Sequence, residues 1–541
     1  MESIIHKIKE TAQINPNKVA LEIEEDGEWR QFKYQDLMKQ LDDVTSLLKK
    51  RGVSAGDRLV LMSENRLENV IAYLAILACE ATAVNIDSNL PLEDLYSLID
   101  QADPRAILAS KKTGGHFTPE RLPYLPVWDI TRSYIPLANF QTNISKKREV
   151  RIAGDPEVAT ILFTSGTTGH YQGVMLSHDN LISAIKESAY MAELTPNDKV
   201  LCLFPMHHVF PLVQFILTPL YYGSQIILVS KLDEKSLFSA FKKKPTKMIV
   251  VPKILEMLHK KIKGEIQRNG SVVQGLISFL QKFSDLVEKT TSLNIRRHLM
   301  KPLQRKFGGK LSLIVCGGAP LSRKVHEDME KWGFIIRQGY GLTETSGAAA
   351  FSNPWLTQVY DSVGVCSNHM EMRIHSPNEN GEGEICLRGK GLMKGYFGDP
   401  EATQQAIRDG WFHTGDLGKI DENGYLFITG RKRELIVLPS GKKAMPHTVE
   451  AHYHDIDGIK DLAVVGMELK GEQTGEMVCA TVVIDDEKQL EEEKIELAFF
   501  ERASTLPDHF RIEKIFFVNE IPRTTSLKVK RHLLKKKLME A

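Results

Sequence analysis

Short apolar runs rich in β-branched residues alternate with amphipathic stretches along the N-terminal part of the chain. This alternation is typical of a layered α/β architecture, in which buried strands and covering helices follow one another. Between the first two runs, residues 65–80 carry apolar side chains at helical spacing, which predicts a βαβ unit. The predicted strands are Leu59–Met62, Ala83–Ile86, Ala106–Ala109, Val158–Phe163, Ile226–Val229, Met248–Val251 and Ser312–Val315.

Two amphipathic patterns precede the last of these strands. Apolar residues recur at helical spacing from Pro252 onward and again from Leu276 to Val287, with the proline in the first turn of the first helix. The spacing predicts a helical insert at this point of the fold.

The pattern changes after Gly430 to a compact set of short elements. Apolar runs at 462–465, 478–484 and 515–518 predict strands, and residues 490–501 predict a helix. These elements are typical of a small α+β unit that folds around its own core.

The length of the chain, 541 residues, exceeds what one hydrophobic core organises, so more than one domain is expected. We expect an α/β protein with a large N-terminal domain of several subdomains, residues 1–430. Residues 431–541 are expected to form a small α+β lid.

One uncharged stretch is long enough to cross a bilayer. Residues 200–230 contain no Asp, Glu, Lys or Arg. Pro205, Pro211, Pro219 and Gly223 interrupt the stretch, and such helix breakers favour a buried loop, helix and strand over a membrane span.

Composition and charge narrow the class of protein. The chain is 42% hydrophobic and 26% charged with a net charge of +1, which is typical of a folded enzyme and gives no global field for nucleic acid. The six cysteines form no CxxC pair and no zinc-ligand spacing, which favours reduced thiols and a cytoplasmic protein. The first residues, MESIIHKIKETAQ, have no apolar core segment, so a targeting signal is not expected.

The first candidate site is a glycine- and hydroxyl-rich run that follows a predicted strand. Such a run lets backbone N–H groups and Oγ atoms converge on phosphate oxygens. The GxxxxGK[ST] spacing of a P-loop is absent, which disfavours P-loop hydrolase chemistry, and a surface turn is the alternative. The phosphate-binding candidates are Thr164, Ser165, Gly166, Thr167, Thr168 and Gly169.

Two further segments combine tight turns with groups that suit a nucleotide. Tyr340 offers an aromatic face for a purine, and Glu344 offers a carboxylate for Mg²⁺. Asp416 offers an acceptor for ribose hydroxyls, and Arg431 follows it in the chain. The alternatives are a solvated glutamate and a β-turn aspartate. The bend around Tyr340 also contains Gly339, Gly341 and Thr343.

The order of these segments, over nearly the whole chain, resembles the adenylate-forming superfamily of acyl-CoA synthetases, firefly luciferase and peptide-synthetase adenylation domains. The resemblance implies an enzyme that activates a carboxylic acid with ATP and Mg²⁺ as an acyl-adenylate and passes the acyl group to coenzyme A. It implies a phosphate loop at Phe163–Gly169, Mg²⁺ on Glu344, and ribose contacts from Asp416 and Arg431. Its adenine-binding turn matches Gly318, Ala319 and Pro320.

The resemblance also implies a mobile lid with assigned residues. Lys528 matches the catalytic lysine, which acts at the α-phosphate, and Arg433 matches the hinge. His208 matches a histidine that gates the acyl site, for which a core histidine is the alternative. For Lys528 the alternative is one more cation on a solvated helix face. The loop expected near the CoA tunnel after lid rotation contains Ser440, Gly441 and Lys442.

The helical insert and the segments 306–310 and 316–321 resemble the long-chain acyl-CoA synthetases. They imply a medium- or long-chain fatty acid as substrate. The apolar residues 209–220 suit the wall of an acyl tunnel, since each buried CH₂ contributes ~0.8 kcal/mol. Ordinary core packing is the alternative for that stretch.

Three positions depart from the family pattern. Gln172 stands where a lysine is usual, so weaker ATP binding or slower turnover is expected, because a charge-assisted hydrogen bond is stronger than a neutral one. Leu527 and Pro211 stand where glycines are usual. Two alternatives therefore stay open: an acyl-AMP ligase that delivers to an acyl carrier protein, and a catalytically impaired nucleotide- or acyl-binding homologue.

A basic stretch raises the question of membrane contact. Lysines cluster at 242–247 and again along the first helix of the insert, at Lys253, Lys260, Lys261 and Lys263. They suit either peripheral contact with an anionic membrane or a solvated helix face. The expected partners are otherwise small molecules: the acid, ATP and CoA.

Overall fold

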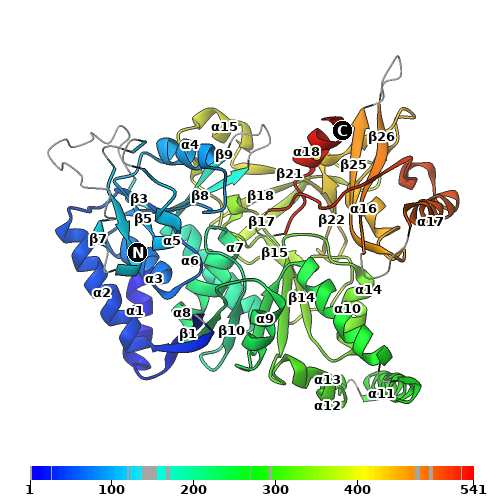
Figure 1. Ribbon diagram of the computed structural model, residues 1–541, viewed down its shortest axis with the longest axis horizontal. Helices are drawn as coiled ribbons and strands as arrows, with labels where there is room; N and C mark the ends of the chain where they lie inside the picture. Colours follow the sequence, from blue (N-terminus) through cyan, green and yellow to red (C-terminus); the bar gives the residue numbers. More distant parts are fainter. Residues whose placement is uncertain are drawn as a thin grey trace.

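The computed structural model describes most of the chain, and every structural statement below refers to these residues. They are 3–25, 27–118, 121–122, 125–132, 135–136, 155–165, 171–268, 270–291, 295–468, 475–485, 491–524 and 527–540. Figure 1 shows a large body with the C-terminal elements at its upper right, above α10 and α14.

The first large sheet has the strand order β19-β9-β8-β4-β3-β5-β6-β7. Its centre is the predicted βαβ unit: β3 and β4 are parallel, with Leu59 opposite Ala83, and α3 (Leu67–Ala78) connects them. The strands are β3 (Arg58–Met62), β4 (Thr82–Asn85), β5 (Ala106–Ala109), β6 (Val127–Asp129), β7 (Ile135–Pro136), β8 (Val158–Ser165), β9 (Tyr171–Ser177) and β19 (Gly395–Tyr396).

The second large sheet has the order β16-β15-β14-β13-β12-β10-β11-β1-β2. Strands β14 to β1 run parallel, so the carboxyl ends of β12, β13 and β14 meet at one edge, where α/β sheets bind ligands. The strands are β1 (Val19–Glu25), β2 (Glu28–Lys33), β10 (Lys199–Cys202), β11 (Gln225–Leu228), β12 (Lys247–Val250), β13 (Leu313–Gly317), β14 (Ile336–Tyr340), β15 (Ala350–Phe351) and β16 (Val365–Cys366). Each predicted strand is confirmed within two residues.

A helical layer and one shared core join the two large sheets. Almost every side chain of α3 is buried, and apolar residues of both sheets belong to one continuous cluster with it. The helices of the large domain are α1 (Ile4–Ile14), α2 (Tyr34–Lys50), α4 (Leu92–Ala102), α5 (Lys111–Gly114), α6 (His178–Ala192), α7 (Val209–Pro211), α8 (Thr218–Tyr222), α9 (Glu234–Phe241), α10 (Pro252–Arg268), α11 (Gly270–Thr291), α12 (Arg296–Leu299), α13 (Lys301–Gln304), α14 (Arg323–Lys331) and α15 (Pro400–Ala406).

The uncharged stretch 200–230 is buried inside the large domain, as predicted. It forms the end of β10, the short α7, a π-helical turn at Leu212–Leu217, α8 and β11. Leu212, Phe215 and Ile216 have no exposed surface. Among the described residues, none of the helices combines the length and the apolar character that crossing a bilayer requires.

A third, antiparallel sheet was not predicted as a unit. Its strand β17 alternates between buried and exposed residues, so that it lacks the long apolar run of a strand in the parallel sheets. They are β17 (Met370–His375), β18 (Gly383–Gly389), β20 (Ile407–Arg408), β21 (Trp411–Ile420) and β22 (Leu426–Arg431).

The C-terminal unit has its own hydrophobic core, and its predicted α+β elements are confirmed. The division of the chain at residue 430 stays a prediction. The elements are β23 (Ile436–Val437), β24 (Lys443–Ala444), α16 (Pro446–Ala451), β25 (Ile459–Glu468), β26 (Glu476–Ile484), α17 (Glu492–Ser504), β27 (Lys514–Phe517) and α18 (Arg531–Glu540).

Candidate active site

A cavity of ≈ 3110 Å³ lies between the large domain and the lid. The carboxyl ends of β12, β13 and β14 open into it, and residues of β21, β22 and the lid line its other walls. The cavity brings together candidate residues that are far apart in the sequence. Those lining it are Thr164, His208, Gly318, Ala319, Pro320, Gly339, Tyr340, Gly341, Thr343, Glu344, Asp416, Arg431, Arg433 and Lys528.

Tyr340, Asp416 and Arg431 form one hydrogen-bonded group in this cavity. The hydroxyl of Tyr340 donates to Oδ2 of Asp416 at 2.7 Å, and Nε of Arg431 lies 2.6 Å from Oδ1 of the same carboxylate. Asp416 and Arg431 are direct cross-strand partners on β21 and β22. Asp416 is 2% exposed, and burial together with its charge raises the pKa of Tyr340. The phenol therefore stays protonated and fixes the orientation of the carboxylate.

Glu344 follows a tight bend after β14 and lies on the short 3₁₀ helix Thr343–Thr345. Its Oε1 accepts a hydrogen bond from the hydroxyl of Tyr396 at 3.0 Å. Burial raises the pKa of this carboxyl group. A half-buried carboxylate that faces the cavity fits a divalent cation such as Mg²⁺, which carboxylates and phosphates bind together. The bend requires glycine at 341, since a Cβ there would lie 2.5 Å from the backbone of Gly347.

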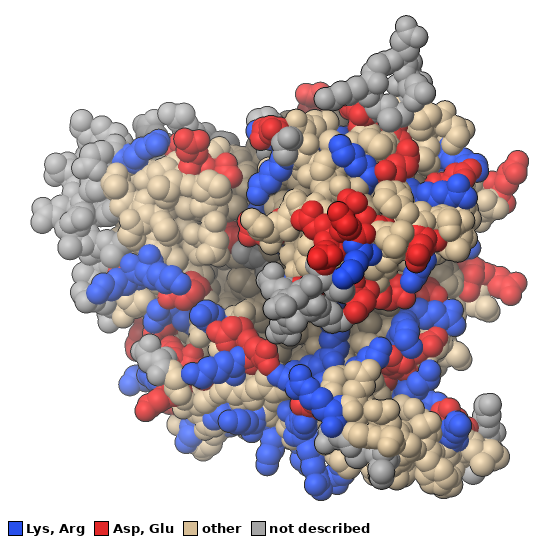
Figure 2. Space-filling view, turned by 45° about the vertical axis from the view of Figure 1, so that its right-hand side comes forward, with Lys and Arg blue, Asp and Glu red and all other residues tan. Residues whose placement is uncertain are grey.

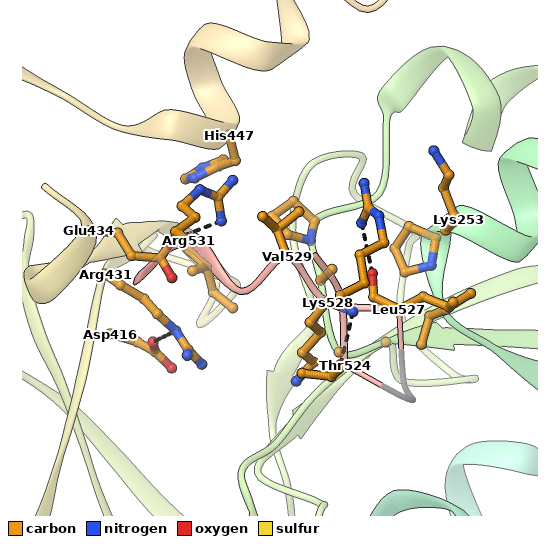
Figure 3. A pocket seen from close by; sticks show the side chains of 18 of the residues that line it. Lys253, Asp416, Arg431, Glu434, His447, Thr524, Leu527, Lys528, Val529 and Arg531 are labelled. Carbon is orange, nitrogen blue, oxygen red and sulfur yellow. Dashed lines mark hydrogen bonds and ion pairs between the residues drawn. The ribbon is translucent and has the colours of Figure 1, made fainter. Parts of the chain in front are cut away.

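The turn after β13 brings the lid lysine to the large domain. Gly318 adopts a φ of +86°, and a Cβ at this position would lie 3.5 Å from Cε and 3.9 Å from Nζ of Lys528. Lys528 therefore extends directly over the predicted adenine-binding turn, into the side of the cavity that faces Asp416 and Arg431 (Figure 3).

The ammonium group of Lys528 faces the open cavity and lies among charges of both signs. Partial desolvation by the cavity walls, and next to it the positive charge of Arg431, lowers the pKa of Lys528 to about 8. The carboxylates of Asp416 and Glu344 act in the opposite direction. The pKa of Lys528 thus lies close to neutral pH, and perturbed pKa values of this kind are common at functional sites.

Leu527, which precedes Lys528, stands where the family usually has glycine, and its side chain makes a contact that glycine could not make. Leu527 adopts a φ of +65°, in the left-handed region that favours glycine. Its side chain packs against the hydrophobic core of the large domain. The apolar contact holds the lid loop against the large domain, which offsets part of the backbone strain. The amide of Lys528 also donates to Oγ1 of Thr524 at 3.1 Å.

An ion-pair network that the sequence analysis missed joins the lid to the large domain. Nζ of Lys253 on α10 lies 2.8 Å from Oδ1 of Asp461 on β25. Arg523 donates to both oxygens of Asp461, at 2.8–3.1 Å, and its Nη1 donates to the backbone carbonyl of Leu527 at 2.8 Å. Lys253 is therefore connected, through two lid residues, to the residue next to Lys528. Figure 3 shows Lys253 beside this loop.

Both histidines of the histidine motif line the cavity. The rings of His207 and His208 are 4.3 Å apart, and Nε2 of His207 lies 3.4 Å from Oδ2 of Asp87. Burial, then the neighbouring His207 and Lys528, lowers the pKa of His208 well below its usual value. His208 is neutral at pH 7, as an acyl-pocket residue should be.

The apolar stretch after this motif divides between two roles. Val209, Phe210, Pro211 and Gln214 line the cavity. The other large apolar residues of this stretch pack into the core of the large domain instead: Leu212, Val213, Phe215, Ile216, Leu217 and Leu220. The predicted tunnel wall is thus confined to the start of the stretch.

The predicted phosphate loop is described only at its ends. Residues 166–169 lie outside the described residues, as does the side chain of Ser165. Strands β8 and β9 pair with Ser165 opposite Tyr171, so both ends of the loop leave the sheet together. Thr164, Tyr171 and Gln172 line the cavity at this point.

The predicted CoA-side loop forms a tight turn between β23 and β24. Gly441 adopts a φ of +76°, and Nζ of Lys442 lies 3.7 Å from Oδ2 of Asp508 in the lid. Ser440, Gly441 and Lys442 are not among the described residues that line the cavity, whereas the predicted hinge residue Arg433 is.

A cluster on the third sheet supports the turn that precedes Asp416. Glu384 and Cys386 lie on one face of β18, and His413 is the cross-strand partner of Cys386. Nδ1 of His413 lies 3.0 Å from Glu384, which also accepts from Lys432 and from the amide of Gly415. These groups could hold a metal ion by type and distance, but they already bind one another. Cross-strand pairing cannot be read from sequence spacing, which is why the cluster was missed.

Comparison with known proteins agrees with this geometry. The model of the family described as AMP-binding enzyme matches residues 8–397, and that of the AMP-binding enzyme C-terminal domain matches residues 448–528. Over 531 residues the chain is 30% identical to a probable CoA ligase of Humulus lupulus, covering 93% of this chain and 87% of that protein. Over 468 residues it is 28% identical to a long-chain-fatty-acid–CoA ligase of Mycobacterium bovis, covering 82% and 76%.

A solved structure confirms the predicted fold class. It is the o-succinylbenzoate CoA synthetase of Bacillus subtilis in complex with its acyl-adenylate intermediate, with a TM-score of 0.74. At 21% identity, the likeness covers 98% of this chain and 97% of that one. The superfamily predicted from the motifs is therefore confirmed: the chain belongs to the family of AMP-binding enzymes.

Proposed function

We propose that the chain is an ATP-dependent acid:CoA ligase that activates a carboxylic acid as its acyl-adenylate and transfers the acyl group to coenzyme A. The observation that carries the proposal is the position of Lys528, a lid residue whose side chain lies beside Gly318 of the large domain, where the charges of Asp416, Glu344 and Arg431 act on it. Enzymes of this family that act as CoA ligases use ATP, Mg²⁺ and CoA. In this chain both the large domain and the lid contribute residues to the cavity.

The nucleotide is held by the large domain in this proposal. Tyr340 and the turn at Gly318 contact the adenine, and Asp416 accepts hydrogen bonds from the ribose hydroxyls. Asp416 suits this role because Tyr340 and Arg431 fix its carboxylate from one side. A Mg²⁺ on Glu344 would neutralise phosphate charge when bound.

The chemical step brings two anions together, since the acid and the α-phosphate are both negatively charged. Lys528 supplies the positive charge between them and stabilises the charge that develops as pyrophosphate leaves. Thioester formation then needs access for the thiol of CoA, so the lid must move Lys528 away, with Arg433 as the hinge. Ser440, Gly441 and Lys442 lie outside the cavity while Lys528 occupies it, as such a two-position lid requires.

For the acid we propose a medium- or long-chain fatty acid. Apolar side chains such as Phe204, Val209 and Phe210 line the cavity around the histidine motif, next to a neutral His208. The long-chain relative and the helical insert support this substrate. The relatives also include a synthetase that acts on o-succinylbenzoate, so an aromatic acid is the alternative. For the acceptor, an acyl carrier protein is the alternative to CoA.

A panel of acids tests this proposal. We expect pyrophosphate release to rise from butyrate to dodecanoate or longer, because each CH₂ that enters an apolar pocket adds binding energy. The release of CoA-thioester is measured in parallel with CoA and with acyl carrier protein. A preference for o-succinylbenzoate over every fatty acid would contradict the proposed substrate, and absence of any acid-dependent release would contradict the ligase itself.

Replacement of Lys528 separates the two half-reactions. We expect Lys528→Ala to lower adenylation by about 10²-fold or more, since removal of one stabilising group in a transition state costs about 2.7–4 kcal/mol. Thioester formation from supplied acyl-AMP should stay within about twofold of the wild-type rate, because the lid has then moved Lys528 away. Equal losses in both half-reactions would show that Lys528 has a structural role instead.

The pH dependence of ATP use should report the same group. In the absence of nucleotide the pKa of Lys528 is about 8, and only the protonated form attracts phosphate. We therefore expect kcat/KM for ATP to be level below this pH and to fall as pH rises through it, since kcat/KM reports the free enzyme. The control is Lys528→Arg, whose guanidinium stays charged and should keep the profile level to higher pH. A wild-type profile without this fall would contradict the assignment.

Lys253 should act as a positioning residue for adenylation. We expect Lys253→Ala to slow adenylation by about two- to fivefold, the effect of a partly exposed ion pair, and to spare thioester formation from acyl-AMP. Lys253→Arg should restore adenylation. The matched control is Lys261→Ala on the same helix, because Lys261 pairs with Glu234 inside the large domain. If both half-reactions fell together in Lys253→Ala, the ion pair would be structural.

A further inference from the structure

Helix α11 carries an apolar face that the rest of the described chain does not cover. Leu276, Phe279, Phe283 and Leu286 are 56%, 63%, 44% and 60% exposed. Their spacing of three and four residues forms one stripe about 15 Å long, at 1.5 Å per residue. The rings of Phe279 and Phe283 stack on each other with centroids 6.4 Å apart. Contiguous apolar surface of this kind marks an interaction site.

The side of α11 that adjoins this stripe, about 100° around the helix, faces the protein. Ile277, Leu280 and Val287 are half-buried, and Ser284 is fully buried. The apolar face of α11 is therefore about half of the helix wide, and the described chain covers only one part of it. The other part, the stripe, is exposed.

The surroundings of this stripe are strongly basic. Residues 252–310 contain 13 Lys and Arg against 4 Asp and Glu, although the whole chain has a net charge of only +1. The positive charge is therefore concentrated around α11, and the remainder of the chain is acidic. Figure 2 shows Lys and Arg gathered along the lower edge of the molecule. Exposed basic residues of this region are Lys260, Lys263, Arg268, Lys282, Lys301, Arg305, Lys306 and Lys310.

We infer that α11, with the basic residues around it, docks the enzyme on the surface of an anionic lipid bilayer. An apolar stripe with aromatic residues inserts at the headgroup boundary, and lysines and arginines near it bind the acidic headgroups. A second copy of the chain is a poor occupant, because two regions with this excess of positive charge repel each other.

Helix α10 connects the docking surface to the active site. Its first residues, Pro252 and Lys253, line the cavity between the domains, and so do residues as far along it as Gln267. Helix α11 begins at Gly270. Docking through α11 therefore places the C-terminal end of α10, which lines the cavity, close to the bilayer, where apolar acids accumulate. The inference does not depend on the identity of the acid, because docking is measured without substrate.

The experiment is flotation of the full-length protein with vesicles. We expect binding to vesicles of phosphatidylcholine with 30% phosphatidylglycerol, weaker binding to pure phosphatidylcholine, and a decrease as NaCl rises from about 50 to 500 mM. The double variant Phe279→Ser with Phe283→Ser should lower vesicle affinity about tenfold or more, because two exposed aromatic anchors are lost. Lys301→Glu with Arg305→Glu should lower it as well and weaken its dependence on salt.

The matched control lies on α17 of the lid. Leu497 and Phe500 are 61% and 49% exposed at the same helical spacing. Residues 491–504 carry 5 Glu against 2 Lys and Arg, so this surface should not bind an anionic bilayer. Leu497→Ser with Phe500→Ser should therefore leave vesicle binding unchanged.

Three results would overturn the inference. The first is a wild-type protein that does not float with anionic vesicles at low salt. The second is an equal loss of binding in the α17 variant. The third is a wild-type protein that is oligomeric without lipid, as measured by light scattering, while the Phe279→Ser, Phe283→Ser variant is monomeric. The stripe would then be an interface between copies of the chain.

Discussion

A positive charge that faces the cavity between two domains is the constraint on which the site depends. The ammonium group of Lys528 loses part of its hydration when the lid lies over Gly318, and the loss of hydration around an incompletely paired charge is unfavourable. Asp416 and Glu344 offset part of this cost, whereas Arg431 adds to it. The phosphates of ATP supply the negative charge that is missing. Nucleotide binding and closure of the lid therefore stabilise each other, as linkage requires of two events that share one interaction.

The contacts that hold the lid in this position are individually weak, and this suits an element that must move in every turnover. Lys253 is 40% exposed and Asp461 18% exposed, and an ion pair of this kind contributes on the order of 1 kcal/mol. The apolar contact of Leu527 is made by a residue in a left-handed conformation, so its gain is partly offset by strain. Stronger contacts would favour one half-reaction at the expense of the other.

The parts of the fold that could be predicted from sequence are those in which one local pattern decides the outcome. The strands of the parallel sheets are buried on both faces, so each appears as an unbroken apolar run, as at Ala106–Ala109. The antiparallel third sheet is half-exposed, with β17 alternating between buried and exposed residues, and it was missed. At the site, the motif residues could be identified because each lies in a short segment. The pair of Lys253 with Asp461 spans 208 residues, and neither residue has a distinctive neighbourhood.

Two apolar segments show why hydrophobic pattern does not determine what covers a helix. Residues 209–220 and residues 276–287 are both rich in apolar side chains, and the second run has helical spacing. The first is buried in the large domain apart from its start at the cavity, whereas the second has one stripe exposed. The difference lies in their neighbours: the flanks of 209–220 are uncharged, and those of α11 are basic. Because lysines and arginines resist burial inside a protein, a basic flank keeps an apolar helix at the surface, where an anionic bilayer satisfies both kinds of side chain at once.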